Sequence, residues 1–343
     1  PLFESDEVME ITIPVDFKSL CRPREEENCD YTPTTLNYSD GHGGEGTLPI
    51  EIMVRGGWRS LSRNCSVPLL WVRFDPATAN GTPFAGQDTL PLTTHCGKGL
   101  SLDNSSVRVT RSDWEQYLLK EYMGQKMYEV FSEVSMRSRL LRIHYRKSEN
   151  SRKTIDNYAF FTEHFDSVAE RNQARPLPRP SFDHQKLDTR AADRLALYQY
   201  MIGNTDWSIV RERNTVLMEM ADGRQVPMPY DLDMSGLVNT HYAGPAPGLP
   251  IEEVTDRHYL GFCHPEVKWN ELFTEFLGER DRILTMVEEQ PGLTTKTRRQ
   301  TRIFLEGFFN TLASEEERQM KIMEFSKTWP PSQVDHTTPA PRK

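Results

Sequence analysis

Short segments in the first part of the chain alternate apolar and polar residues with the two-residue period of a β-strand. They lie at 8–14, 48–54 and 67–74. The stretch between the first two is rich in Asp, Gly and Ser, so we expect a loop there, and the Asn-Gly-Thr-Pro sequence within 75–86 predicts a turn. The N-terminal part of the chain is therefore predicted to be largely β.

A helix and a hairpin are predicted next. Ser112 with Glu115 three residues later is an N-cap pattern, and apolar side chains then recur at helical spacing. Segments 139–145 and 158–163 have strand patterns and flank a charged loop, which predicts a hairpin. Three prolines make 172–183 a stiff extended connector and the expected boundary between two lobes.

The second half of the chain has mainly helical patterns. Amphipathic helices are predicted at 188–202, 269–286 and 298–309. Two short strands around an Ala-Asp-Gly-Arg turn predict a hairpin at 216–230. We therefore expect an α+β chain that divides into 1–170, 171–328 and a proline-rich, disordered tail at 329–343.

Length and charge exclude several classes of protein. The chain has 343 residues, enough for about two domains. Its 41 basic and 50 acidic residues give a net charge of -9, which argues against a non-specific nucleic-acid-binding protein, since such a protein presents a basic face. No apolar stretch of the sequence approaches the ~18 residues of a transmembrane segment.

The five cysteines have two interpretations. Cys21 and Cys29 bracket a charged loop and could form a local disulfide, and Cys65 with Cys96 could form a second one, leaving Cys263 unpaired. Spacing alone is equally compatible with free thiols in a reducing compartment. The sequence has no CxxC zinc pattern, which argues against a structural zinc site.

Polar residues gather where the helix predicted at 188–202 ends. Gly203 can take the left-handed conformation that terminates a helix, so Asn204 and Asp206 are expected on a loop and not on a solvated helical face. Side chains of these types also cap backbone groups in turns, and this structural role remains an alternative for both residues.

Two more acidic residues, Asp231 and Asp233, follow the predicted hairpin and are expected to approach Asp206 and Asn214. Carboxylate and amide oxygens suit Mg²⁺, which takes few protein ligands and leaves positions for phosphate. A phosphoryl-transfer site needs such a set, with one carboxylate to orient or deprotonate the acceptor hydroxyl. The alternative is that Asp231 and Asp233 are turn carboxylates.

The same residues carry a resemblance to a known family. Gly203-Asn-Thr-Asp-Trp-Ser, Asn214 and Val226-Pro-Met-Pro-Tyr-Asp-Leu-Asp resemble an uncharacterised family of exported bacterial proteins, which is similar to the spore-coat protein H (CotH) kinases. Further matching segments span most of the chain and begin at Phe3, Val54, Cys65, Phe84, Thr94, Glu115 and Asp256. The resemblance implies a two-lobed protein-kinase-like fold, with a β-rich N-terminal lobe and a mostly helical C-terminal lobe.

The resemblance also implies roles for the polar residues. Asp206 would be the catalytic aspartate, with Asn204 a second catalytic residue on the same loop. Asn214 and Asp231 would hold Mg²⁺ or Mn²⁺ on the phosphates of ATP, with Asp233 assisting.

In the N-terminal lobe the resemblance implies a nucleotide site. Arg55 would lie near phosphate, and Glu121 would be the helix glutamate that pairs with a strand cation. Residues 158–165, including Glu163, would form the hinge beside adenine.

The strand predicted at 67–74 departs from the kinase pattern. The kinases carry lysines around this strand, whereas here Arg73 is the one charge left on it. Arg55 or Arg73 could bind phosphate instead, because a guanidinium can contact phosphate in a bidentate manner. Because the lysine is missing, a second hypothesis is a pseudokinase, which binds nucleotide without catalysis.

These observations predict an atypical secreted kinase-like phosphotransferase that uses ATP with Mg²⁺ or Mn²⁺ and acts on a protein or small-molecule hydroxyl acceptor. One alternative is a catalytically inactive secreted binding or coat module, and another is a metal-dependent glycosyl transferase in which Asp231 and Asp233 form an Asp-x-Asp motif. The resemblance to exported proteins favours disulfides and a secreted, periplasmic or cell-surface location, with a signal peptide removed before Pro1. A cytoplasmic location is the alternative.

Overall fold

The computed structural model describes residues 2–39, 44–97, 113–148 and 154–331. These residues separate into two units. Unit 1 contains the described residues up to Tyr122 together with Arg137–His164, and unit 2 contains Met123–Met136 together with the described residues from Phe165 onward. Helix α2 (Asp113–Glu129) contributes its first part to unit 1 and its last part to unit 2.

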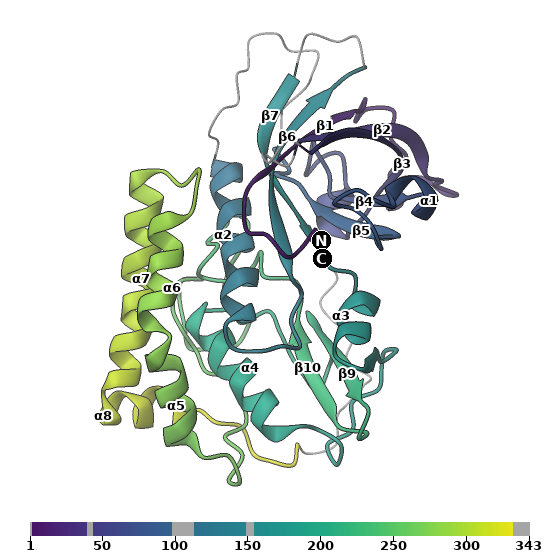
Figure 1. The fold of residues 1–343 in the computed structure, drawn as a ribbon. Helices are drawn as coiled ribbons and strands as arrows, with labels where there is room; N and C mark the ends of the chain where they lie inside the picture. The colour runs from purple at the N-terminus through teal and green to yellow at the C-terminus, as the bar shows by residue number, and fades with distance from the viewer. Residues whose placement is uncertain (1, 40–43, 98–112, 149–153, 332–343) are drawn as a thin grey trace. The chain divides into compact units, whose positions relative to one another are not determined.

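Unit 1 is built on a closed barrel that the described residues form from seven strands (Figure 1). In barrel order the strands are β1 (Met9–Pro14), β2 (Thr32–Ser39), β3 (Glu45–Val54), β4 (Leu70–Phe74), β5 (Thr89–Thr93), β7 (Thr154–Thr162) and β6 (Ser138–Arg146). Neighbouring strands are antiparallel except where the barrel closes, because β1 runs parallel to β6 with Met9 opposite Leu141. Helix α1 (Pro76–Ala79) and the 3-10 turn η1 (Trp58–Ser60) lie in its loops.

The alternation of apolar and polar residues decides which face of each strand turns inward. Met9, Ile11 and Ile13 of β1 are buried, whereas the residues between them are exposed or half-buried. Strand β3 repeats this pattern from residue 48 to residue 54. Burial of such a side chain stabilises the fold by about 1.5–3 kcal/mol, so the apolar stripes of the strands fill the barrel interior.

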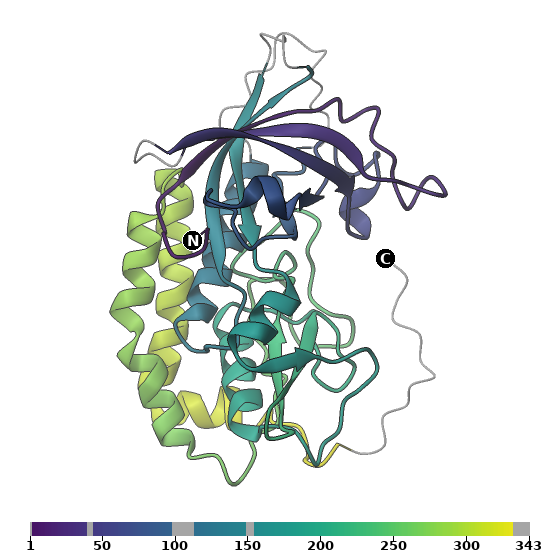
Figure 2. The same cartoon turned by 45° about the vertical axis from the view of Figure 1, so that its right-hand side comes forward.

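Unit 2 combines a small sheet with helices. Strands β8 (Ala174–Pro176), β9 (Thr215–Met220) and β10 (Gln225–Pro229) pair in the order β10-β9-β8. Besides the end of α2, the helices are α3 (Phe165–Arg171), α4 (Thr189–Met201), α5 (Trp269–Gly278), α6 (Arg280–Glu289), α7 (Thr295–Ala313), α8 (Glu315–Arg318) and the π-helical turn η2 (Gln319–Met323). Figures 1 and 2 show α6 and α7 lying side by side.

The two-lobed protein-kinase-like fold expected from the sequence is wrong. The described chain forms a closed barrel, a separate three-stranded sheet and helices instead. Strand patterns predict which segments are extended, but they do not predict that β1 will pair with β6, which is far away in the chain. The pattern also missed β2 and β5, since most residues of β2 are half-buried or exposed and β5 contains Pro91.

Most local predictions are confirmed by the secondary structure. The strands at 8–14 and 48–54, the two hairpins and the helix at 188–202 are present within a few residues of the expected bounds. The helix predicted at 269–286 is divided at Glu279 into α5 and α6. Ser112 and all of the predicted tail beyond residue 331 lie outside the described residues.

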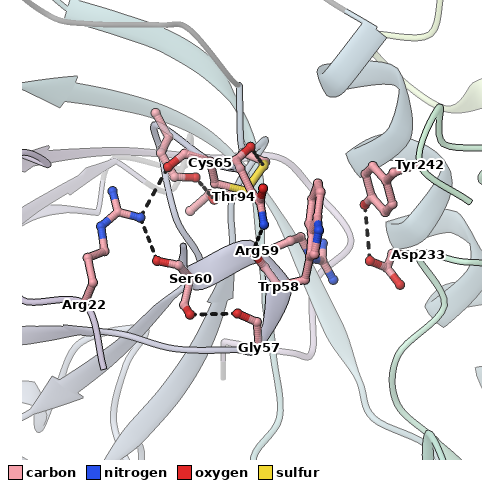
Figure 3. The surroundings of a disulfide bond; sticks show 12 residues. Arg22, Gly57, Trp58, Arg59, Ser60, Cys65, Thr94, Asp233 and Tyr242 are labelled. Carbon is pink, nitrogen blue, oxygen red and sulfur yellow. Dashed lines mark hydrogen bonds between the residues drawn. A yellow bond between two sulfur atoms is a disulfide. The ribbon is translucent and has the colours of Figure 1, made fainter. Parts of the chain in front are cut away.

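Two disulfides cross-link loops of unit 1. Cys21 is bonded to Cys29 and Cys65 to Cys96, the two pairs that the spacing allowed, and Cys263 is a free thiol. Figure 3 shows the buried Arg22 beside the second bond, where its guanidinium donates to the carbonyl oxygens of Ser60 at 3.0 Å and Cys65 at 3.2 Å. These disulfides are consistent with an exported protein.

Within the ranges that the structure describes, every helix is too short or too polar to cross a bilayer.

The two disulfides should differ in their effect on stability. The chain-entropy relation gives about 3.7 kcal/mol for the pair 31 residues apart, Cys65–Cys96, and about 2.5 kcal/mol for the pair 8 residues apart, Cys21–Cys29. We predict that the Cys65→Ala/Cys96→Ala variant melts at a lower temperature than Cys21→Ala/Cys29→Ala in calorimetry without reductant. Equal melting temperatures would show that loop length does not govern the stabilisation.

Candidate functional site

The loop after α4 begins with a tight helix end. Ile202 is the last residue of the helix cap, and Gly203 then takes a left-handed conformation with φ of 62°, as the sequence predicted. Asn204 follows, and its side-chain oxygen accepts a hydrogen bond from the backbone N–H of Asp206 at 2.9 Å. Both Asn204 and Asp206 are buried, so the loop is a packed part of unit 2.

The carboxylate of Asp206 is held by two side chains from the same loop. The amide nitrogen of Asn214 donates to the carboxylate at 3.0 Å and to the backbone oxygen of Asp206 at 2.7 Å. Arg213 forms an ion pair with the other carboxylate oxygen. Because Asn214 presents its nitrogen to Asp206, its amide oxygen faces away from this carboxylate.

Three backbone hydrogen bonds join this loop to the segment that carries Asp231 and Asp233. The backbone N–H of Tyr230 donates to the backbone oxygen of Asn214 at 3.3 Å. This bond lies where β10 ends, opposite the start of β9. The backbone N–H of Gly236 donates to the backbone oxygen of Gly203 at 3.0 Å. The backbone N–H of Leu237 donates to the backbone oxygen of Ile202 at 2.9 Å. The segment 230–237 is therefore attached to the loop 202–214 at both ends, which brings all the predicted residues of this site into one part of unit 2.

The two aspartates of the Asp-x-Asp motif differ in their surroundings. Leu232 between them is fully buried. Asp233 is also buried, and one of its carboxylate oxygens accepts a hydrogen bond from the Tyr242 hydroxyl at 3.2 Å (Figure 3). Asp231 is half-buried. Among the described residues, no three acidic, histidine or cysteine side chains are arranged to hold a metal ion by themselves.

The arginines predicted to bind phosphate contact other groups of unit 1. Arg55 donates to the backbone oxygen of Leu70 at 3.2 Å and to the Thr93 hydroxyl at 3.1 Å, with its guanidinium 5.4 Å from the centre of the Trp71 ring. Arg73 donates to Glu51 at 2.7 Å through Nε and also through a second guanidinium nitrogen. Both arginines are therefore already bound to protein groups.

Glu121 and Glu163 are both buried in unit 1. Glu121 forms a bidentate ion pair with Arg59 of η1, at 2.9 and 3.2 Å, rather than with a strand cation. The carboxylate of Glu163 accepts a hydrogen bond from the backbone N–H of Arg137 at 2.9 Å. Arg59 was not predicted as a site residue, although it is the second arginine of the Arg-Gly-x-x-Arg segment that begins at Arg55.

A buried acid–base pair in unit 2 was also missed. Asp193 of α4 accepts hydrogen bonds from the His264 ring at 2.7 Å and from its backbone N–H at 3.0 Å. Burial raises the pKa of Asp193 to about 6, although the hydrogen bonds from His264 oppose this shift. The pair joins α4 to the chain before α5, and only a spatial contact could have revealed it, because the two residues are 71 positions apart.

Segment 230–237 passes close to the backbone of residues 254 and 255 at a glycine. A Cβ atom at Gly236 would lie 2.6 Å from the backbone oxygen of Val254 and 3.1 Å from the Cα of Thr255. We predict that Gly236→Ala lowers the free energy of unfolding by about 1–3 kcal/mol in chemical denaturation, because the backbone must move. Gly278→Ala is the matched control, since a Cβ there meets nothing within 4 Å, and it should cause no loss. Equal effects of the two substitutions would contradict this account.

Comparisons of this chain with protein family models, curated proteins and solved structures found no match.

Proposed function

We propose that this protein transfers phosphate from ATP to a hydroxyl acceptor at the site formed by segments 202–214 and 230–237. The main support is the pair of backbone connections between these segments, which brings Asp206, Asn214 and Asp231 to one region of unit 2. Phosphoryl transfer requires this set of groups, namely a base for the acceptor and oxygen ligands for a metal on the phosphates.

In this proposal Asp206 accepts the proton of the acceptor hydroxyl. The amide nitrogen of Asn214 and the guanidinium of Arg213 both contact its carboxylate. The same two bonds restrict the rotation of the carboxylate, which favours a fixed position for the acceptor. Arg213 also balances the negative charge of Asp206 inside a buried loop.

Asn214 and Asp231 are the proposed ligands for Mg²⁺ or Mn²⁺. Mg²⁺ is usually held by one or two protein carboxylates plus phosphate and water, so a cluster of three acidic residues is not required. The amide oxygen of Asn214 faces away from Asp206, and Asp231 directly follows the residue that is bonded to Asn214. A bound ion would supply charge neutralisation for the phosphates, and Asp233, held by Tyr242, would keep the segment in position.

The disulfides of unit 1 support a location outside the reducing cytoplasm. We place the activity in the periplasm, at the cell surface or in the secreted fraction.

A non-catalytic binding protein is the second candidate function. It is favoured by the contacts of Arg55 and Arg73, since both arginines already bind protein groups and the strand lysine of the CotH kinases is missing. Such a protein would bind nucleotide and metal, or an acidic partner, without phosphate transfer.

Nucleotide binding should depend on the metal and on Asp231. We predict that ATP with Mg²⁺ or Mn²⁺ raises the melting temperature of the wild type, corresponding to about 2.7 kcal/mol at a ligand concentration 100 times Kd. EDTA or the near-isosteric Asp231→Asn substitution should abolish this shift. Asp222→Asn is the matched control, because Asp222 lies in the exposed turn between β9 and β10 and pairs with Arg224.

Each outcome of this titration has a defined meaning. A wild type without any metal-dependent shift would contradict the phosphotransferase proposal. A shift with UDP-sugars and Mn²⁺ but not with ATP would instead support the glycosyl transferase alternative.

Catalysis should depend on Asp206 more strongly than nucleotide binding does. We predict that Asp206→Asn lowers phosphate transfer from labelled ATP to casein, or to the protein itself, by about 10²–10⁴-fold while the ATP-induced thermal shift remains. Asp222→Asn should retain full transfer. If the wild type binds ATP but transfers no phosphate, or if Asp206→Asn transfers at the wild-type rate, the assignment of Asp206 as the base is wrong.

A further inference from the structure

The connector before α4 is fixed against the loop that carries Asp206. Glu212 of this loop is buried and accepts hydrogen bonds from the backbone N–H groups of Ser181 at 2.5 Å and Phe182 at 2.7 Å. Gln225 of β10 also donates to the backbone oxygen of Ser181 at 2.8 Å. Residues near the end of the connector are therefore held in a defined position beside the loop that carries Asp206.

Arg179 of this connector lies beside the residues proposed to bind metal. Its guanidinium donates to the backbone oxygen of Thr215 at 2.8 Å and to the Tyr230 hydroxyl at 3.3 Å, and lies 5.2 Å from the centre of the Tyr230 ring. Thr215 follows Asn214, and Tyr230 precedes Asp231. Arg179 thus contacts the sequence neighbours of both metal-binding candidates, and its side chain is exposed.

Two further cations are found near this loop. Arg211 is exposed and its backbone N–H donates to the Ser208 hydroxyl at 3.1 Å. Lys327 is held by a backbone hydrogen bond to Gly261 at 2.9 Å. Burial, and in addition the nearby charge of Arg211, lower the pKa of Lys327. We call Arg179, Arg211 and Lys327 the basic rim.

The basic rim has no counter-ions within the part of the chain that the structure describes. Salt bridges there involve Arg175, Arg190, Arg194, Arg213 and Arg224 of unit 2, but none involves a member of the rim. Glu212, which lies next to Arg211, uses a carboxylate oxygen for backbone N–H groups instead. In a chain with a net charge of -9, cations without counter-ions among the described residues are electrostatically available to an anionic ligand.

We propose that the basic rim binds an acidic segment of a protein acceptor, next to the hydroxyl that approaches Asp206. Arg179 is already oriented by Thr215 and Tyr230, so it loses little side-chain freedom when it binds a carboxylate. Binding of the acidic segment does not require catalysis, whereas phosphorylation of its hydroxyl rests on the function proposed above.

The experiment compares three fluorescent peptides that differ only in charge. Each has one serine, flanked by four Glu, four Gln or four Lys residues, and binding to the full chain is measured by anisotropy at low salt without nucleotide. We expect the Glu peptide to bind the wild type at least about tenfold more tightly than the Gln peptide does, and to lose affinity with added salt. The rim variant Arg179→Gln/Arg211→Gln/Lys327→Gln should bind the Glu peptide about tenfold more weakly than the wild type does.

The control variant removes three exposed cations elsewhere in unit 2, Arg175→Gln/Lys268→Gln/Arg282→Gln. It has the same net charge as the rim variant and should bind the Glu peptide as the wild type does. Equal weakening by both variants would show a non-specific charge effect and overturn the proposal. The proposal would also be overturned if the Glu and Gln peptides bound with equal affinity, or if neither bound.

The nucleotide assay separates this proposal from the proposed function. If the rim instead holds nucleotide phosphates, the rim variant will lose the ATP-induced thermal shift, and the assignment to an acceptor fails. If the Glu peptide binds through the rim but ATP causes no shift in the wild type, the acidic-segment site stands and the phosphotransferase proposal fails.

Discussion

The candidate site depends on the backbone hydrogen bonds between segments 202–214 and 230–237. Gly203 turns with a positive φ at the end of α4 and accepts one of these bonds, and Gly236, which donates it, has no side chain where the backbone of residues 254 and 255 passes. The β9–β10 hairpin supplies the remaining connection, at Asn214 and Tyr230. Without these contacts the polar residues would lie on separate loops, and no shared chemistry could be assigned to them.

The charged groups of the site fall into two sets, a buried carboxylate paired within the protein and exposed cations without salt bridges among the described residues. Asp206 is buried and balanced by Arg213, while Asn214 restricts the orientation of its carboxylate. The exposed cations of the basic rim have no such partners among the described residues, so they are the groups that an external anion can reach. In the proposed function, Asp206 keeps its orientation because Arg213 neutralises its charge within the protein, while the basic rim remains available to an acidic acceptor.

Sequence patterns predicted the local elements around the candidate site but not the overall fold. The helix end at Gly203, the hairpin and the approach of Asn214 to Asp206 follow from local rules for caps, turns and strand pairing, which act over a few residues. Closure of the barrel by β1 and β6 and the Arg59–Glu121 ion pair join residues distant in the chain, which periodicity does not encode. The resemblance to CotH kinases rests on the local motifs, and it therefore gave the wrong fold.

The most direct test of the central claim is a crystal structure with Mn²⁺ and a non-hydrolysable ATP analogue, in which anomalous scattering locates the metal. Our account predicts a peak bonded to a carboxylate oxygen of Asp231 and to the amide oxygen of Asn214, at about 2.0–2.2 Å, with phosphate oxygens completing the coordination. A peak elsewhere, or nucleotide bound without contact to either residue, would contradict it.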